Sequence, residues 1–183
     1  MILLTGFGPY DIYKRNISSE IVKNLEIADL DINIRKEVLP VSWKLSIRSY
    51  QDILNKLSRK PKIVVLLGIH SNRHYHLENL GWNFAFGKDI DNLIKIGIIR
   101  YNLHLWLRTI LNVRELYSLL KERIDIKLSN FAGTYLCNYL YYWALSLSDK
   151  KYPVLFIHIP NNEKLKRGVE IISTIIRTIN TIL

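Results

Sequence analysis

The sequence predicts an α/β domain in which helices cover both faces of a mostly parallel central sheet, a three-layer α/β/α sandwich. Two observations predict it. Runs of strand length alternate along the chain with longer runs whose apolar residues recur at helical spacing. Two of the strand-like runs, Ile63–Leu67 and Val154–Ile157, are apolar at every position, as expected of strands that are covered on both sides.

In the N-terminal half, apolar runs and capping residues indicate the order of elements. Residues 2–5 form an apolar run closed by a Gly-Phe-Gly-Pro turn, which is typical of a buried strand entering a loop. Asn16 or Ser18 caps the helix that follows, and a looser alternation at 32–38 predicts the next strand. Ser42 caps a second helix ahead of the first all-apolar run. The inner faces of these helices carry Ile21, Leu25 and Ala28 in the first, and Trp43, Ile47, Tyr50, Leu54 and Leu57 in the second.

The middle of the chain is less regular. Residues 69–92 are polar and rich in His and Asn, which predicts a long loop with a functional role, and residues 93–111 mix strand-like and alternating patterns. A short strand is expected at 126–128. Three further helices are predicted by the apolar residues Val113, Leu116, Leu120 and Ile124, by Leu136, Leu140, Trp143 and Leu147, and by Leu165, Val169, Ile172, Ile176 and Ile179.

Composition narrows the class of protein. The 183 residues fit one domain, 1–183, with no internal repeat or linker, and 49% hydrophobic residues exclude an intrinsically disordered chain. A single cysteine leaves no partner for an intramolecular disulfide, which predicts a cytoplasmic protein. The apolar runs fall short of the roughly 18 to 20 residues of a membrane span, so we expect no membrane partner.

The charge balance raises the question of an anionic partner. The chain has 26 basic and 16 acidic residues and a net charge of +10. This charge makes a nucleic-acid-binding protein an alternative to an enzyme. The basic residues are spread over predicted helix faces and turns, and no nucleic-acid-binding motif accompanies them. We therefore expect no nucleic-acid partner and interpret the charge as a solvated surface.

Three reactive side chains follow predicted strands. Cys137 lies in the opening turns of a helix, where free N–H groups and the helix dipole stabilise a thiolate. His158 follows the all-apolar run Val154–Ile157, and Glu78 lies at the far end of the loop expected after Leu67. Taken alone, each residue more often has a structural role. A single cysteine is usually a small buried apolar residue, a histidine at a strand end usually only makes hydrogen bonds, and a loop glutamate is usually solvated. Together they supply the nucleophile, base and orienting group that cysteine catalysis needs.

Two other kinds of site are weaker. His70, His74 and His76 lie close together, but their spacing fits no common zinc motif and no second cysteine or carboxylate cluster completes a metal site. We expect these histidines to be hydrogen-bonding loop residues. The glycines at 6–9 lack the third glycine and the later acidic residue of a dinucleotide-binding loop.

Several segments resemble one enzyme family. Residues 129–138, Ser-Asn-Phe-Ala-Gly-Thr-Tyr-Leu-Cys-Asn, resemble the Ser-Asn-x-Ala-Gly-x-Tyr-x-Cys-Asn signature of the pyroglutamyl peptidase I, or pyrrolidone-carboxyl peptidase, family. Residues 156–160 are similar to its Phe-Ile-His-x-Pro segment, and residues 5–10 to its Thr-Gly-Phe-x-Pro-Phe loop. Further similar blocks occur at 16–18, 38–41 and 78–83, so the resemblance runs in order across nearly the whole chain.

The resemblance implies a cysteine peptidase that removes an N-terminal pyroglutamyl residue from a peptide, with no metal or organic cofactor. Cys137 would be the nucleophile, His158 the base and Glu78 the group that orients the imidazole. The family's tetramers imply a homo-oligomer. The resemblance also assigns Phe7, Tyr10, Asn16, Tyr135 and Leu136 to substrate binding, and Lys88 and Arg73 to the region of the reacting carbonyl.

The chain departs from the family pattern near these positions. Ser71-Asn72-Arg73 stands in place of Gly-Gly-Arg, and the distance from Arg73 to Glu78 is one residue shorter than expected. Lys88 stands in place of an Arg, keeping the charge but losing the planar guanidinium, and Tyr10 replaces a Phe. The alternative is therefore a catalytically impaired or re-specified homologue.

Overall fold

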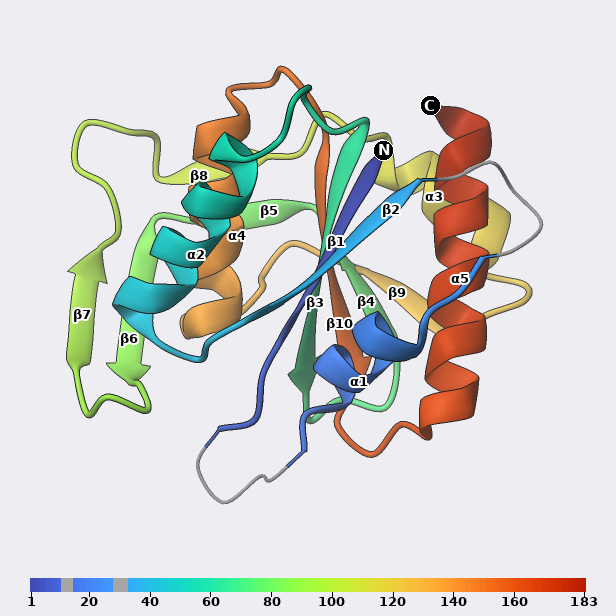
Figure 1. The fold of residues 1–183 in the computed structure, drawn as a ribbon, viewed down its shortest axis with the longest axis horizontal. Helices are drawn as coiled ribbons and strands as arrows, with labels where there is room; N and C mark the ends of the chain where they lie inside the picture. Colours follow the sequence, from blue (N-terminus) through green and yellow to red (C-terminus); the bar gives the residue numbers. More distant parts are fainter. Residues whose placement is uncertain (11–14, 28–32) are drawn as a thin grey trace.

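A six-stranded sheet forms the centre of the molecule, in a computed structural model that describes residues 1–10, 15–27 and 33–183. The strand order is β2-β1-β3-β10-β4-β9, and every neighbouring pair is parallel except β10 and β4 (Figure 1). The strands are β1 (Ile2–Phe7), β2 (Ile34–Leu39), β3 (Ile63–His70), β4 (Tyr75–Glu78), β9 (Ile126–Ser129) and β10 (Val154–Pro160). The mostly parallel sheet is as predicted.

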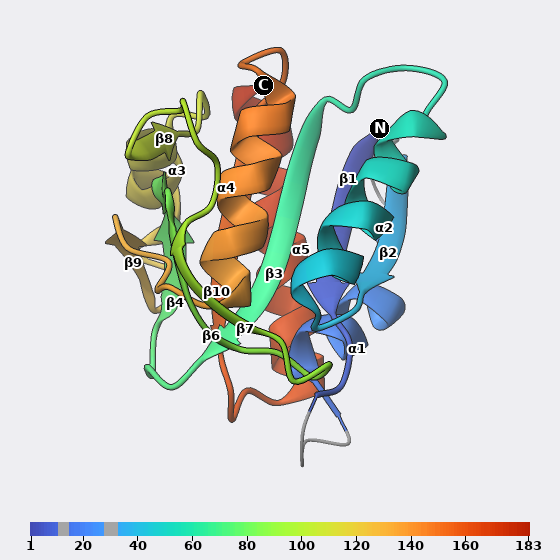
Figure 2. The ribbon, with the colours of Figure 1, turned by 90° about the vertical axis from the view of Figure 1, so that its left-hand side faces the viewer.

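Helices cover both faces of this sheet, which confirms the three layers. One face carries α1 (Ile17–Asn24), α3 (Val113–Leu120) and α5 (Leu165–Ile182), and the other carries α2 (Trp43–Asn55) and α4 (Leu136–Ser148) (Figures 1 and 2). No helix in the described part of the chain is long and apolar enough to cross a bilayer.

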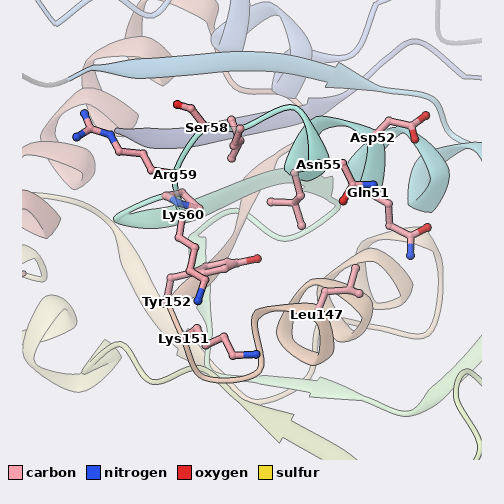
Figure 3. A pocket seen from close by; sticks show the side chains of 12 residues that line it. Gln51, Asp52, Asn55, Ser58, Arg59, Lys60, Leu147, Lys151 and Tyr152 are labelled. Atoms are coloured by element: carbon pink, nitrogen blue, oxygen red, sulfur yellow. The ribbon is translucent and has the colours of Figure 1, made fainter.

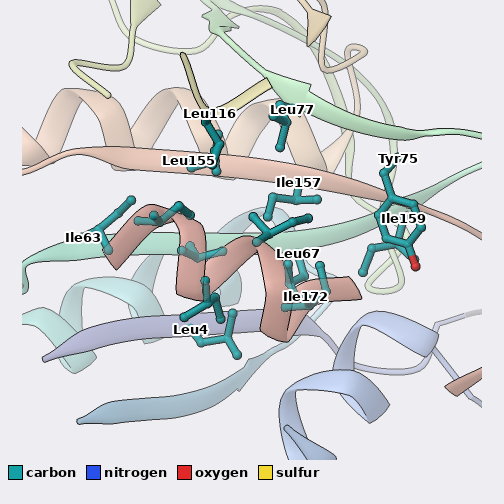
Figure 4. Packing of buried hydrophobic residues seen from close by; sticks show 14 of the residues in the cluster. Leu4, Ile63, Leu67, Tyr75, Leu77, Leu116, Leu155, Ile157, Ile159 and Ile172 are labelled. Atoms are coloured by element: carbon teal, nitrogen blue, oxygen red, sulfur yellow. The ribbon is translucent and has the colours of Figure 1, made fainter. Parts of the chain in front are cut away.

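Alternation along the buried strands explains why they are apolar at every position. In β3, Ile63, Val65 and Leu67 pack in the core under α1, α3 and α5, while Val64 and Leu66 pack in the core under α2 and α4. Residues of β10 divide in the same way, and Leu155 and Ile157 lie in the first core beside Leu67 (Figure 4). Each of these strands therefore needs apolar residues at both its odd-numbered and its even-numbered positions.

The predicted helices are present, and some are shorter than predicted. Asn16 is the N-cap of α1 and Ser42 that of α2, where their side chains accept the N–H groups of Ser18 and Leu45 at 3.1 and 3.2 Å. Helix α2 ends before Leu57. The predicted core residues Leu25 and Ile124 likewise follow α1 and α3, while Ala28 and Ile32 lie outside the described residues.

The prediction of a loop at residues 69–92 is wrong. That segment contains β4, β5 (Leu80–Trp82) and β6 (Phe84–Lys88), and the unassigned stretch after it supplies β7 (Ile94–Ile98) and β8 (Trp106–Arg108). Strand β5 pairs with β8 and β6 with β7, both antiparallel. The polar residues of β4 caused the error, because they alternate with buried Tyr75 and Leu77 and are themselves enclosed by neighbouring strands.

Candidate active site

Cys137 lies where the chain enters helix α4. It is the second residue of the helix, as predicted, and is half-buried. The N-cap residue makes no side-chain hydrogen bond to this helix start, so the first N–H groups of the helix are not capped by it. Cys137 lines a pocket of about 360 Å³ together with Glu78, His158 and Tyr135. The thiol is therefore both accessible and close to free backbone donors.

His158 and Glu78 meet inside this pocket although 80 residues separate them. His158 Nδ1 donates to Glu78 Oε1 at 2.7 Å, and the two residues are 5% and 0% exposed. Glu78 lies opposite Phe156 in the antiparallel β4–β10 pair, one pleat from His158. Tyr141 of α4 anchors the same segment, since its hydroxyl donates to the backbone carbonyl of Glu78 at 2.8 Å. Glu78 thus ends a sheet strand rather than a loop.

The surroundings of His158 favour its charged form. Burial by itself lowers the pKa of the imidazole, but the charge of Cys137 and hydrogen bonds with Cys137 and Glu78 outweigh it and raise the pKa to about 9. Because a carboxylate only accepts, Nδ1 carries the proton that faces Glu78 and Nε2 is left for Cys137. The carboxylate is thus hydrogen-bonded to the imidazole, and the imidazole in turn interacts with the thiol.

Gly68 makes room for the thiol. It lies beside His158 in the parallel β3–β10 pair, on the same face of the sheet. A Cβ at this position would lie 2.8 Å from Cys137 Sγ and 2.7 Å from Cζ of Phe156. Helix α4 can therefore bring Cys137 next to the sheet only because residue 68 has no side chain. Sequence reasoning missed this role, although the glycine follows directly on the all-apolar run.

Asn138 fixes the start of α4 against the neighbouring strands. Its side-chain oxygen accepts the Trp82 N–H at 2.8 Å, and its amide donates to the carbonyls of Trp82 and Phe84, each at 2.9 Å. Asn138 is fully buried. It follows Cys137 directly, so this set of bonds holds the backbone next to Cys137 in place. The signature around Cys137 contains this residue, but its role was not predicted.

Of the residues assigned to substrate binding, Tyr135 lines the pocket. Its hydroxyl donates to the Lys88 carbonyl at 2.8 Å. Leu136 is buried in the core under α2 and α4, and Phe7 packs in the same core with Tyr10 against it. None of these three is among the residues that line the pocket.

Asn16, Lys88 and Arg73 also lie outside the pocket lining. Asn16 is buried, caps α1, and donates from its amide to the Gly8 carbonyl at 3.1 Å, so its polar atoms hold the loop after β1. Lys88 and Arg73 have exposed side chains. The structure brings Cys137, His158, Glu78 and Tyr135 together in the pocket lining. Asn16, Lys88 and Arg73 lie outside that lining.

The clustered histidines divide into two groups. His74 is at the surface with Asp125, their side chains 2.6 Å apart, whereas His70 and His76 line the pocket beside His158. Among the described residues, no three His, Cys, Asp or Glu side chains are arranged to hold a metal ion.

A larger hollow lies at the opposite edge of the sheet, near the amino ends of β3 and β10 (Figure 3). It measures about 820 Å³, and its basic side chains are Arg59, Lys60 and Lys151. These residues follow the C-terminal ends of α2 and α4, whose partial negative charge they complement. We therefore assign its charge to helix stabilisation, and place the chemistry at the smaller pocket around Cys137.

Comparison with known proteins places the chain in one family. The family model described as "Pyroglutamyl peptidase" matches residues 1–166. The pyrrolidone-carboxylate peptidase of Thermosipho africanus is 31% identical over 167 residues, covering 87% of this chain and 80% of the relative. That of Thermosipho melanesiensis is 29% identical over 179 residues, covering 91% and 86%.

Solved structures agree. The pyrrolidone carboxyl peptidase from Thermus thermophilus has a TM-score of 0.87 at 28% identity, covering 100% of both chains. The one from Thermococcus litoralis has a TM-score of 0.89 at 24% identity, covers 98% of this chain and 93% of that chain, and bears on the fold alone.

Gly68→Ala tests the close approach of α4 to the sheet. The added Cβ must displace Cys137 Sγ, so we expect alkylation of Cys137 by iodoacetamide to slow by roughly 10- to 100-fold. Gly8→Ala is the matched control, because the nearest atoms to its added Cβ are 3.6 Å away and require no shift. Equal alkylation rates in the two variants would show that Gly68 does not limit the position of the thiol.

Proposed function

The chain belongs to the pyroglutamyl peptidase family, and from that premise we propose that it hydrolyses the amide bond after an N-terminal pyroglutamyl residue. Cys137, His158 and Glu78 are the proposed catalytic residues. The observation that carries the proposal is that the buried Glu78 carboxylate is hydrogen-bonded to His158 at the pocket that Cys137 also lines. A cytoplasmic location, predicted from the single cysteine, is part of the same proposal.

Each residue has a separate role in the proposed reaction. Cys137 Sγ attacks the pyroglutamyl carbonyl carbon, and His158 holds the proton that the thiol has given up. When the tetrahedral intermediate collapses, Nε2 gives that proton to the leaving amine and a thioester remains on Cys137. A water molecule then attacks the thioester while His158 accepts its proton, which releases pyroglutamate and the free thiol. Glu78 keeps Nδ1 protonated and stabilises the imidazolium throughout.

Backbone groups are the proposed stabilisers of the oxyanion. The N–H groups in the first turn of α4 have no side-chain cap and lie next to the nucleophile. Lys88 and Arg73, which the family resemblance assigns to the carbonyl region, have exposed side chains outside the pocket lining. We therefore assign the oxyanion to the backbone N–H groups rather than to these two side chains, and an impaired or re-specified homologue would differ at residues 73 and 88.

The proposed substrate fits the aromatic part of the pocket wall. A pyroglutamyl group is a flat neutral lactam, which ring contacts and a few backbone hydrogen bonds can hold. Tyr135 lines the pocket, with its ring held edge-on to Trp43 at a centroid distance of 5.2 Å. We propose Tyr135 as the residue that recognises the lactam. Phe7 and Tyr10, to which the family resemblance gives the same role, lie outside the pocket lining, so the proposal rests on Tyr135.

Hydrolysis of a pyroglutamyl aminomethylcoumarin amide tests the activity directly. We expect the wild-type chain to release the coumarin and Cys137→Ala to lose about 10³-fold or more in kcat/KM, because the nucleophile is gone. Thermal unfolding of both proteins checks that the variant is folded. Activity that persists in Cys137→Ala would overturn the proposal, and a folded wild-type protein without activity would favour the impaired homologue.

The pH dependence of kcat/KM tests the state of His158. We expect an acid limb, where the Cys–His pair takes up a further proton, and an alkaline limb near pH 9, where the imidazolium loses its proton. In Glu78→Gln, a negative charge that raises the pKa of His158 is removed, so the alkaline limb should move to lower pH. A profile without an alkaline limb up to pH 10, or an unmoved alkaline limb in the variant, would contradict the coupled pair.

We also propose that the chain forms a homo-oligomer through the outer face of the β6–β7 hairpin. This face consists of apolar residues that point away from the core: Phe84, Phe86, Ile94, Ile96 and Ile98, which are 41–70% exposed. They lie on adjacent antiparallel strands, so they form one contiguous patch. Contiguous exposed apolar surface of this kind is typical of subunit interfaces.

Light scattering after size-exclusion chromatography tests the proposed interface. We expect the wild-type chain to run as an oligomer and Ile96→Lys to run as a monomer, since it places a charge in the centre of the patch. Leu119→Lys is the control, because Leu119 is a similarly exposed apolar residue on α3, away from the hairpin. A monomeric wild-type chain, or an Ile96→Lys oligomer, would contradict the proposal.

A further inference from the structure

We propose that His70 is a positioning residue that holds the imidazole plane of His158 between Glu78 and Cys137. The inference rests on the proposed function, because it concerns the base of the same reaction. Nothing in the resemblance to known peptidases assigned His70 a role in the reaction. It is the last residue of β3 and lies two residues beyond Gly68, on the same face of the sheet.

The two imidazole rings are stacked. The centroids of His70 and His158 are 5.0 Å apart and their planes are 16° from parallel. Phe156 also contacts His158, with centroids 4.8 Å apart and planes at 51°. The χ2 torsion of histidine has broad minima, so its own rotamer preference leaves the ring plane poorly defined. The rings of His70 and Phe156 restrict that rotation, in addition to the hydrogen bond to Glu78.

His70 is itself held by the turn between β3 and β4. Its Nε2 is 2.9 Å from the His74 carbonyl, and its Nδ1 is 3.4 Å from the Asn72 amide nitrogen. One ring nitrogen therefore donates and the other accepts, which fixes a single neutral tautomer. With both nitrogens engaged, the ring cannot turn away from His158 without losing a hydrogen bond.

His70 also stays uncharged beside the imidazolium. Burial and the charge of His158 lower the pKa of His70 to about 4, against smaller opposing effects of the His74 bond and of Glu78. The titratable groups that face it are His158, His76 and Glu78. From pH 5 to 8 it can therefore stack on His158 without repelling its positive charge.

Steady-state kinetics of His70 variants on a pyroglutamyl amide test this role. We expect His70→Ala to lower kcat about tenfold with KM changed less than about twofold, because the base is misaligned but the substrate still binds. His70→Phe restores a flat ring and should stay within about threefold of the wild-type kcat, whereas His70→Leu, of similar bulk, should not. His74→Ala is the control, since it removes a nearby exposed histidine side chain and keeps its carbonyl.

Alkylation of Cys137 by iodoacetamide gives a second readout that needs no substrate. We expect the rates to follow the same order, with wild type and His70→Phe above His70→Leu and His70→Ala. If His70→Ala fails to fold, as judged by thermal unfolding, the test is the difference in rates between His70→Phe and His70→Leu. Equal rates in Phe and Leu variants, or an unchanged kcat in a folded His70→Ala, would overturn the inference.

The two readouts separate this inference from the proposed function. If the wild-type chain cleaves no pyroglutamyl amide but the alkylation rates keep the expected order, the proposed function fails and the role of His70 stands. If the wild-type chain is active and neither readout changes with residue 70, the role of His70 alone is wrong.

Discussion

The buried hydrogen bond between Glu78 and His158 is the interaction on which the rest of the site depends. A carboxylate that is 0% exposed needs a partner, because burying a charge without one is costly. His158 supplies it at 2.7 Å, and removing one member of such a pair typically costs about 3–5 kcal/mol. Because the two residues come from β4 and β10, the site forms only when those strands pair. Fold and chemistry thus rest on the same contact.

The antiparallel insertion of β4 into an otherwise parallel sheet makes that contact possible. Strand β4 lies between β10 and β9, and its register sets Glu78 opposite Phe156 and His76 opposite His158. On the other side of β10, Gly68 leaves room for the start of α4 to bring Cys137 to the imidazole. The three reactive groups therefore come from β4, β10 and the start of α4, and strand register sets the spacing of Glu78 and His158.

Residues with a strong local signal were predictable, and residues whose environment is made by distant segments were not. The wholly apolar strands, the helical faces and the caps Asn16 and Ser42 follow from local pattern, as does the place of Cys137 at a helix start. Strand β4 was not predicted, because its polar residues are buried by strands that are far away in the sequence. Asn16 was assigned to substrate by resemblance, yet its hydrogen bonds serve the cap and the loop after β1.

The central claim is that Cys137 forms a covalent thioester with the pyroglutamyl group, and a trapped intermediate tests it most directly. The wild-type chain would be mixed with a pyroglutamyl ester, quenched in acid within milliseconds, and mapped by peptide mass spectrometry. We expect a mass increase of one pyroglutamyl group on the peptide that contains Cys137. Turnover of the ester with the group on another residue, or with no adduct at any quench time, would contradict it.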